Sequence, residues 1–247
     1  MPFSHSSEEL KAIQRFTVPT IANALETFNA LPANEGFCSP NMKCMFPELG
    51  TMIGYAVTAR ITSDLPPSEA RPALPDAELW RFVASKPGPK VVVVQDMDTP
   101  AKGAIWGEFN SNVYRALGCV GTVTEGGVRD LEGVSGLGFH LFATQVLPSH
   151  AYAFFMDYGG PVRVGGMIVR TGDLVVGDRH GVIYIPEDVS LGELAKVAEE
   201  IERLEQEVFD FCQSPEFNID DMEKLDRSVA ERWPRPMGQD KPAVRSI

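Results

Sequence analysis

The sequence lacks any long hydrophobic run. Its densest apolar stretch is the four valines at residues 91–94, far short of the ~20 apolar residues that a membrane-spanning helix needs. The first nine residues carry neither a basic segment nor an apolar one, so no secretory signal is expected. The chain also has no internal repeat and no low-complexity tract. These absences favour a cytoplasmic protein that does not act in a membrane.

Cysteine and histidine are both scarce, with four of each among 247 residues. The cysteines Cys38, Cys44, Cys119 and Cys212 are too few and too scattered for a disulfide scaffold. Five residues separate Cys38 from Cys44, which is poor spacing for zinc, and the histidines form no H-x-x-x-H pair. We therefore expect reduced cysteines without a catalytic or metal-binding role.

Basic residues are in short supply as well. There are 22 Lys and Arg against 34 Asp and Glu, which gives a formal net charge of -12. Wide contact with a phosphate backbone needs clustered basic side chains, so nucleic acid is not an expected partner. Hydrophobic residues make up 44% and charged residues 23%, a balance typical of soluble globular proteins. The length suits one large domain, or one ordinary domain with extensions.

The middle of the chain alternates between predicted strands and helices. Continuous apolar or β-branched runs predict strands at residues 54–62, 90–95, 118–124 and 140–146. Apolar spacings of three and four predict helices at residues 7–16, 19–28, 77–85, 108–117 and 129–137. Asp76 is expected to cap the helix at residues 77–85. This alternation favours an α/β fold with parallel strands.

The last third of the chain has a different pattern. Short apolar segments broken by Gly and Asp, between residues 162 and 186, predict a series of short strands as in a barrel or a swivelling domain. Apolar residues from Leu191 to Phe211 then recur at threes and fours, which predicts one long helix. We therefore divide the chain into an α/β domain at residues 1–190 and a C-terminal helix and tail at residues 191–247. The tail carries Pro234, Pro236 and Pro242 and is expected to pack on a neighbouring subunit.

The most informative stretch is residues 118–130, where a predicted buried strand ends in two glycines and leads to Arg129 and Asp130. Ligands of open α/β sheets gather at the carboxyl ends of strands. The guanidinium fork of Arg matches a carboxylate, and Asp offers a hard oxygen ligand for magnesium or manganese. Upstream, residues 107–110 open a helix whose free N–H groups can bind an anion. Spacing alone leaves open the alternative that Arg129 and Asp130 are a helix-capping pair at the surface.

The motif Gly-Val-Arg-Asp at residues 127–130, followed by Gly165-Gly166 and by the run from Thr171 to Pro186, resembles the RraA-like family. The resemblance covers about residues 19–211. That family includes class II, divalent-metal 4-hydroxy-4-methyl-2-oxoglutarate aldolases, which also decarboxylate oxaloacetate. The resemblance implies an α/β/β/α swivelling-type domain with a C-terminal helical extension, assembled as a homotrimer or homohexamer with active sites at subunit interfaces.

The resemblance also implies roles for individual residues. Arg129 would bind the carboxylate and keto oxygen of the substrate, and Asp130 would hold a magnesium or manganese ion. Glu108 would position a water for proton transfer, and Glu205 would be an acid supplied to the site of a neighbouring subunit. Backbone amides would contact the substrate from Gly107, Glu108, Phe109 and Asn110.

The sequence departs from the family pattern at Asn23, Glu125 and His180. These differences bear on the identity of the substrate more than on metal binding.

We predict a metal-dependent lyase that cleaves a small 2-oxo acid to pyruvate through an enolate. Two alternatives remain: a non-catalytic binding protein like the regulators of ribonuclease activity, and a sugar-acid lyase or hydratase with the same metal chemistry. The presence of both Asp130 and Glu108 favours an enzyme.

Overall fold

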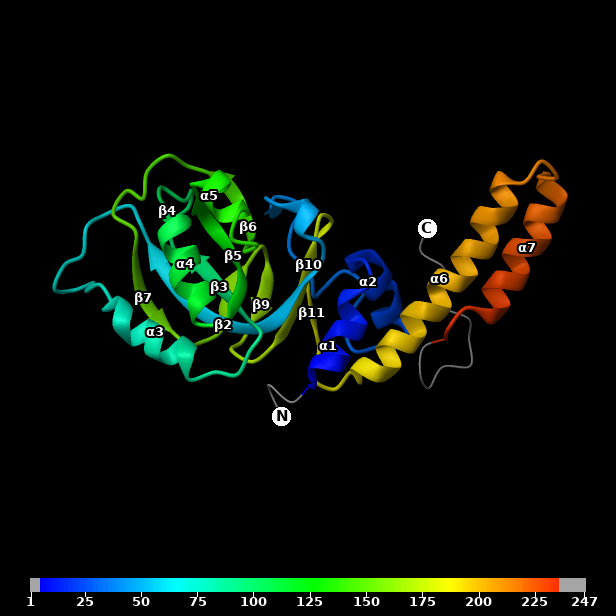
Figure 1. Cartoon of the computed structure of the whole chain (residues 1–247), viewed down its shortest axis with the longest axis horizontal. Helices are drawn as coiled ribbons and strands as arrows, with labels where there is room; N and C mark the ends of the chain where they lie inside the picture. The colour runs from blue at the N-terminus through cyan, green and yellow to red at the C-terminus, as the bar shows by residue number, and fades with distance from the viewer. Residues whose placement is uncertain (1–4, 236–247) are drawn as a thin grey trace.

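The computed structural model describes residues 5–235 and shows an α/β body from which two helices extend (Figure 1). Pro236 and Pro242 of the predicted tail lie outside these residues. The predicted α/β class and the C-terminal helical extension are confirmed. Within residues 5–235, no helix combines the length and the apolar composition that crossing a membrane requires.

Four parallel strands form the centre of a nine-stranded sheet: β2 (Met52–Thr62), β3 (Lys90–Asp96), β5 (Cys119–Val128) and β6 (His140–Val146). The valines at residues 91–94 are fully buried, because both faces of β3 are covered. Val92 and Val94 face a cluster that includes residues of α3 (Asp76–Ala84), α4 (Glu108–Ala116) and α5 (Leu131–Ser135). Val91 and Val93 face the opposite cluster, with residues of β8 (Val162–Val164) and β9 (Met167–Val169). This two-sided burial explains why the run is continuously apolar.

Antiparallel strands extend the sheet on both sides of this centre. β10 (Leu174–Asp178) pairs with β2 and with β11 (Gly181–Ile185), and β7 (Phe154–Tyr158) pairs with the other half of β2. β1 (Lys43–Cys44) lies on the far edge beside β6, while β8 and β9 form a separate two-stranded sheet. The short strands predicted between residues 162 and 186 are therefore confirmed.

Three helices cover β10 and β11: α1 (Ser7–Gln14), α2 (Val18–Glu26) and the first half of α6 (Leu191–Gln213). A capping box between Ser6 and Glu9 begins α1, and the hydroxyl of Thr17 begins α2. Leu194 and Ile201 of α6 are fully buried against these elements. The sequence from both ends of the chain thus meets in one hydrophobic cluster.

The second half of α6 and α7 (Ile219–Arg232) form a helical hairpin that extends away from the body (Figure 1). Burial along α6 ends at Leu204, and Val229 is the one buried residue of α7. Phe211 and Phe217 pack together with ring centroids 5.6 Å apart. Large apolar side chains remain exposed on the hairpin: Phe209 at 49%, Phe217 at 48% and Ile219 at 73%.

Several elements differ from the sequence predictions. β5 runs to Val128, beyond the predicted end at residue 124, because Gly127 and Val128 still pair with β4 on one side and β6 on the other. α5 is correspondingly shorter than the predicted helix at residues 129–137. Asp76 does not cap α3, since Pro75 occupies the capping position and makes no side-chain hydrogen bond.

Five elements were not predicted: β1, the 3₁₀ helix η1 (Pro47–Leu49), β4 (Ala104–Trp106), β7 and α7. β1 and β4 are only two and three residues long, too short for a periodic pattern. α7 has an apolar stripe at Ile219, Met222, Leu225 and Val229, which the sequence predictions did not use, although the helix buries only Val229.

We predict that two truncations on the same helix will separate the covered half of α6 from its extended half. Leu194→Ala should lower the free energy of unfolding by about 2–5 kcal/mol, because it leaves a cavity in a closed cluster. In the single chain, Phe209→Ala should change it by less than about 0.5 kcal/mol, as expected for a side chain that one chain leaves exposed. Denaturant unfolding monitored by circular dichroism, at a concentration where the protein is a single chain, measures both. A loss from Phe209→Ala as large as that from Leu194→Ala under these conditions would contradict the exposed position of Phe209 in the single chain.

Candidate active site

The candidate site lies where two parallel strands end side by side. β4 pairs with β5 through Ala104 and Gly127 and through Trp106 and Val128. The N–H of Arg129 donates to the carbonyl oxygen of Trp106 at 2.9 Å, which continues the pairing one residue further. Gly107 and Arg129 are the residues that follow β4 and β5, so they lie next to each other. They lie at the sheet edge where ligands of α/β proteins gather.

Asp130 holds the junction between this strand end and α4. Its Oδ2 accepts the backbone N–H of Glu108 at 3.2 Å and lies 3.5 Å from Nε of Arg129. The alternative that Asp130 is a helix cap is therefore partly correct. Its side chain caps α4 but makes no cap hydrogen bond to its own helix, α5. The Asp130 side chain is 45% exposed, and within residues 5–235 its Oδ1 accepts no hydrogen bond.

The backbone of Asp130 is left-handed, with φ 56° and ψ 42°. Among residues other than Gly, Asn and Asp occupy this region most readily, because their short polar side chains tolerate it. Non-glycine residues in this conformation cluster at functional sites, where surrounding contacts hold them. The N–H of Glu108 is one such contact here.

Gly107 is in direct backbone contact with both side chains. A Cβ atom at this position would lie 2.5 Å from Oδ2 of Asp130 and 3.0 Å from Cγ of Arg129. No other residue type fits without moving one of these groups. The terminal nitrogens of the Arg129 guanidinium donate no hydrogen bond to any part of the chain that the structure describes, so they remain available to a ligand.

These groups open into a pocket of about 580 Å³. Of the sequence-predicted residues, Gly107, Phe109, Asn110, Arg129 and Asp130 line it, so the structure brings these five together. Phe109 is 69% exposed at its rim, and Asn110 donates its side-chain amide to the carbonyl oxygen of Ile105 at 2.6 Å.

Two predicted acids do not line this pocket. The Glu108 carboxyl group lies over α5, since a Cβ on Gly133 would meet it at 2.6 Å. Glu205 is half-buried on α6, and along the long axis of the molecule α6 lies at the opposite end from β4 and α5 (Figure 1). A Glu205 side chain can therefore reach such a pocket only in another copy of the chain.

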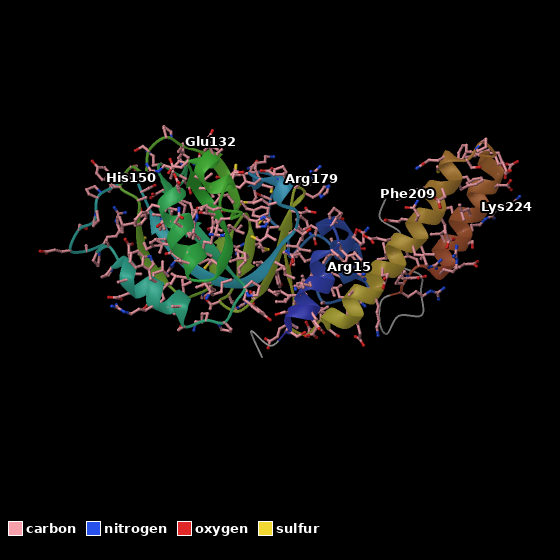
Figure 2. All side chains as sticks on the ribbon, viewed as in Figure 1. Arg15, Glu132, His150, Arg179, Phe209 and Lys224 are labelled. Carbon is pink, nitrogen blue, oxygen red and sulfur yellow. The ribbon has the colours of Figure 1, made fainter. Side chains whose placement is uncertain are left out.

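The pocket also contains titratable residues that sequence reasoning missed, namely Asp76 in the first turn of α3 and His150 in the loop between β6 and β7. Figure 2 shows His150 on the body, at the end of the molecule away from Phe209 and Lys224 of the hairpin. Neither residue is near Arg129 in sequence. The loop of His150 is linked to the site by a tertiary contact, the hydrogen bond from Ala104 N–H of β4 to the carbonyl oxygen of Ser149 at 2.9 Å.

The side chains at this site can be compared with the ligands that the metal implied by the family resemblance requires. No group of three His, Cys, Asp or Glu side chains within residues 5–235 is arranged to hold a metal ion, which argues against a closed zinc site. Magnesium, by contrast, keeps several waters and takes one or two carboxylates together with substrate oxygens. Asp130, which lines an open pocket and has an unengaged Oδ1, fits that second type of site.

Beside these groups, a carboxylate network holds the loop after β3. Asp98 accepts hydrogen bonds from the hydroxyl of Thr62 at 2.9 Å and from the N–H of Asp64 at 3.0 Å. Burial raises the pKa of Asp96 to about 6, and the negative charges of Asp98 and Glu125 act in the same direction. Asp96 Oδ2 is buried without a hydrogen-bond partner among the described residues. This network ties the end of β2 to the segment that leads into β4.

Known proteins share sequence similarity with this chain over the region that contains these residues. The family model RraA-like, described as Aldolase/RraA, matches residues 18–184. A protein of Halalkalibacterium halodurans named "Putative 4-hydroxy-4-methyl-2-oxoglutarate aldolase" is 32% identical over 99 residues, which are 40% of this chain and 47% of that protein. An uncharacterized protein of Methanocaldococcus jannaschii is 33% identical over 106 residues, 42% of this chain and 50% of that one. The chain thus matches about half the length of each of these relatives.

Solved structures share the fold at lower identity. A Streptomyces coelicolor protein, RraAS2, described as an unusual member of the RNase ES inhibitor RraA protein family, superposes with a TM-score of 0.65 at 24% identity, covering 83% of this chain and 98% of its own. An uncharacterized protein from Pseudomonas syringae pv. tomato has a TM-score of 0.68 at 18% identity and covers 90% of this chain and 98% of its own.

We predict that Gly107→Ala will disrupt the site more than the fold. The added Cβ must displace Asp130 or Arg129, so Mn²⁺ binding, measured by the paramagnetic resonance of free Mn²⁺, should weaken at least about tenfold, or 1.4 kcal/mol. Gly160→Ala is the matched control, because nothing lies within 4 Å of its added Cβ. Unchanged Mn²⁺ binding in folded Gly107→Ala protein would contradict this account of the site.

Proposed function

The chain belongs to the RraA-like family, and we propose that it is a divalent-metal-dependent lyase that cleaves a small 2-oxo acid. The proposed reactions are retro-aldol cleavage of a 4-hydroxy-4-methyl-2-oxoglutarate-type substrate to pyruvate and decarboxylation of oxaloacetate. The observation that carries the proposal is the pair Arg129 and Asp130 directly after β5, which line one pocket with partly exposed side chains. The relative named as an aldolase supports the choice of reaction.

The pocket suits a 2-oxo acid for electrostatic reasons. A 2-oxo acid presents a carboxylate and an adjacent keto oxygen, and the planar fork of Arg129 can donate to both. The first turn of α4 adds backbone N–H groups that have no acceptor within their own helix, and only one of them, from Glu108, is taken by Asp130. We infer that Phe109 and Asn110 contribute the remaining amides.

The chemistry follows from the positions of these groups. When a divalent metal is bound at Asp130, it supplies Lewis-acid polarisation of the keto oxygen. Arg129 stabilises the negative charge that develops on that oxygen when the bond between C3 and C4 breaks. Retro-aldol cleavage and β-decarboxylation both leave an enolate of pyruvate, so the same two residues serve both reactions.

The other functions considered from the sequence differ in what they require. A sugar-acid lyase or hydratase would use Arg129 and Asp130 in the same way, and a panel of 2-oxo acids and sugar acids assayed for pyruvate release separates it from the proposed enzyme. A binding protein comparable to the RNase ES inhibitor family would require neither catalysis nor metal. Loss of activity on metal removal, regained with Mg²⁺ or Mn²⁺, discriminates against that second alternative.

We further propose that the hairpin of α6 and α7 packs on a neighbouring subunit and brings Glu205 toward its pocket. Phe209, Phe217 and Ile219 leave an apolar surface on the hairpin that one chain does not cover. Glu205 lies on α6, as Phe209 does, and α6 lies on the other side of the molecule from β4 and α5 (Figure 1).

We predict an oligomer of three or six 27.0 kDa chains by light scattering. Replacing Phe217 and Ile219 together by Ser should shift the mass toward the single chain and lower activity with it. The body should keep its circular dichroism, because neither residue is buried. A fully active single chain at assay concentration would contradict the interface proposal.

We predict that two conservative substitutions will separate metal binding from substrate binding. Asp130→Asn keeps a residue that tolerates the left-handed backbone but removes the charge, so Mn²⁺ affinity and turnover should fall together. Arg129→Lys keeps the charge but loses the fork, so Mn²⁺ should bind nearly normally while kcat/KM for oxaloacetate falls roughly 10²–10³-fold.

Both variants should keep the melting temperature of the parent within a few degrees, because neither side chain belongs to a buried cluster. If either variant keeps oxaloacetate decarboxylation within about threefold of the parent, the pair is structural and the binding-protein function is preferred.

A further inference from the structure

We propose that His150 is the proton carrier of this pocket, taking the hydroxyl proton of an aldol substrate and returning it to C3 of the enolate. This inference rests on the proposed function and adds a residue that neither the family resemblance nor the sequence motifs assign. His150 lines the same pocket as Arg129 and Asp130 but comes from a different part of the chain, the loop between β6 and β7.

The loop that carries His150 is fastened to the strand that ends at the site. Its Ser149 carbonyl oxygen accepts the N–H of Ala104 in β4 at 2.9 Å, and its Tyr152 N–H donates to the carbonyl oxygen of Ser63 at 3.2 Å. A Cβ on Gly103 would lie only 2.3 Å from the carbonyl oxygen of His150, so the two backbones are in close contact. His150 therefore lies beside the start of β4, and Gly107 directly follows the end of the same strand.

The hydrogen bond of the imidazole determines which nitrogen can react. Nδ1 of His150 lies 2.6 Å from the carbonyl oxygen of Ala151. A carbonyl oxygen only accepts, so Nδ1 carries the hydrogen and Nε2 of the neutral ring is the proton acceptor. The backbone of Ala151 is left-handed, with φ 47°, an unusual conformation for alanine that turns its carbonyl group toward the ring.

Other groups in the pocket are less suited to carry a proton. Arg129 stays charged, and Asp130 is the proposed metal ligand that also caps α4. The amide of Asn110 is engaged with Ile105 and does not titrate. Among the described residues of the same chain, Asp76, on α3, is the remaining titratable residue that lines the pocket and is the competitor to be tested.

The step balances without any further reactant. Nε2 of His150 takes the proton of the C4 hydroxyl, the oxygen becomes the carbonyl of one product, and the C3–C4 bond breaks. Its electron pair forms the enolate of pyruvate. The protonated ring then gives the same proton to C3, which yields the second product and restores the neutral ring.

Decarboxylation makes a different demand on the pocket. Loss of carbon dioxide from oxaloacetate reaches the same enolate with no hydroxyl proton to remove. A proton carrier is therefore needed for retro-aldol cleavage and for enolisation of pyruvate, but it is dispensable for release of carbon dioxide. This difference provides the test.

The experiment compares His150→Gln with the parent in three assays with Mg²⁺. Aldol cleavage and deuterium exchange of the pyruvate methyl group should each fall about 10²–10⁴-fold, the usual contribution of general acid–base catalysis. Oxaloacetate decarboxylation should stay within about fivefold. Calorimetric binding of oxalate, a planar mimic of the enolate, should be unchanged and shows that the site is intact.

His180→Gln is the matched control, because His180 lies in the turn between β10 and β11 and outside the pocket. Equal losses of aldol cleavage and decarboxylation in His150→Gln would overturn the inference, as would exchange that persists in His150→Gln but disappears in Asp76→Asn. A parent protein inactive in all three assays would overturn the proposed function and the inference with it. An active parent whose His150→Gln variant keeps aldol cleavage overturns the inference alone.

Discussion

The backbone of Gly107 lies against Asp130 and Arg129 closely enough that no side chain fits between them. This contact depends on the parallel pairing of β4 with β5, which brings both strand ends to the same edge. It also brings the N–H of Glu108 to the Asp130 carboxylate, and that hydrogen bond offsets part of the cost of a left-handed backbone at Asp130. The charged pair, the start of α4 and the end of the sheet thus form one unit.

Much of the body follows from local pattern. The valines at residues 91–94 predict a strand covered on both faces because every second side chain must be buried on each side, and the two clusters around β3 show this arrangement. Arg129 and Asp130 could be singled out because they directly follow a buried strand. The position of Gly107 beside them could be predicted only from the family resemblance, since twenty-two residues separate it from Asp130 without a periodic signal.

The remaining parts depend on tertiary contacts that the sequence does not display. His150 reaches the pocket through backbone hydrogen bonds to β4 and Ser63, and any residue type could make these bonds. The direction of Glu108 is decided by the open space over Gly133, which is a property of α5. α7 has an apolar stripe in its sequence, but it buries only Val229 and is joined to α6 by the ion pair of Arg232 with Glu207, and the stripe does not show these contacts.

The left-handed backbone at position 130 has a consequence for how such a chain can change over evolutionary time. Asp, Asn and Gly are the residue types that adopt this conformation at low cost, and of these only Asp carries a charge. A single exchange to Asn or Gly is therefore nearly neutral for the backbone while it removes the carboxylate. The same scaffold can lose its chemistry without losing its shape, which leaves a surface free to be selected for recognition alone.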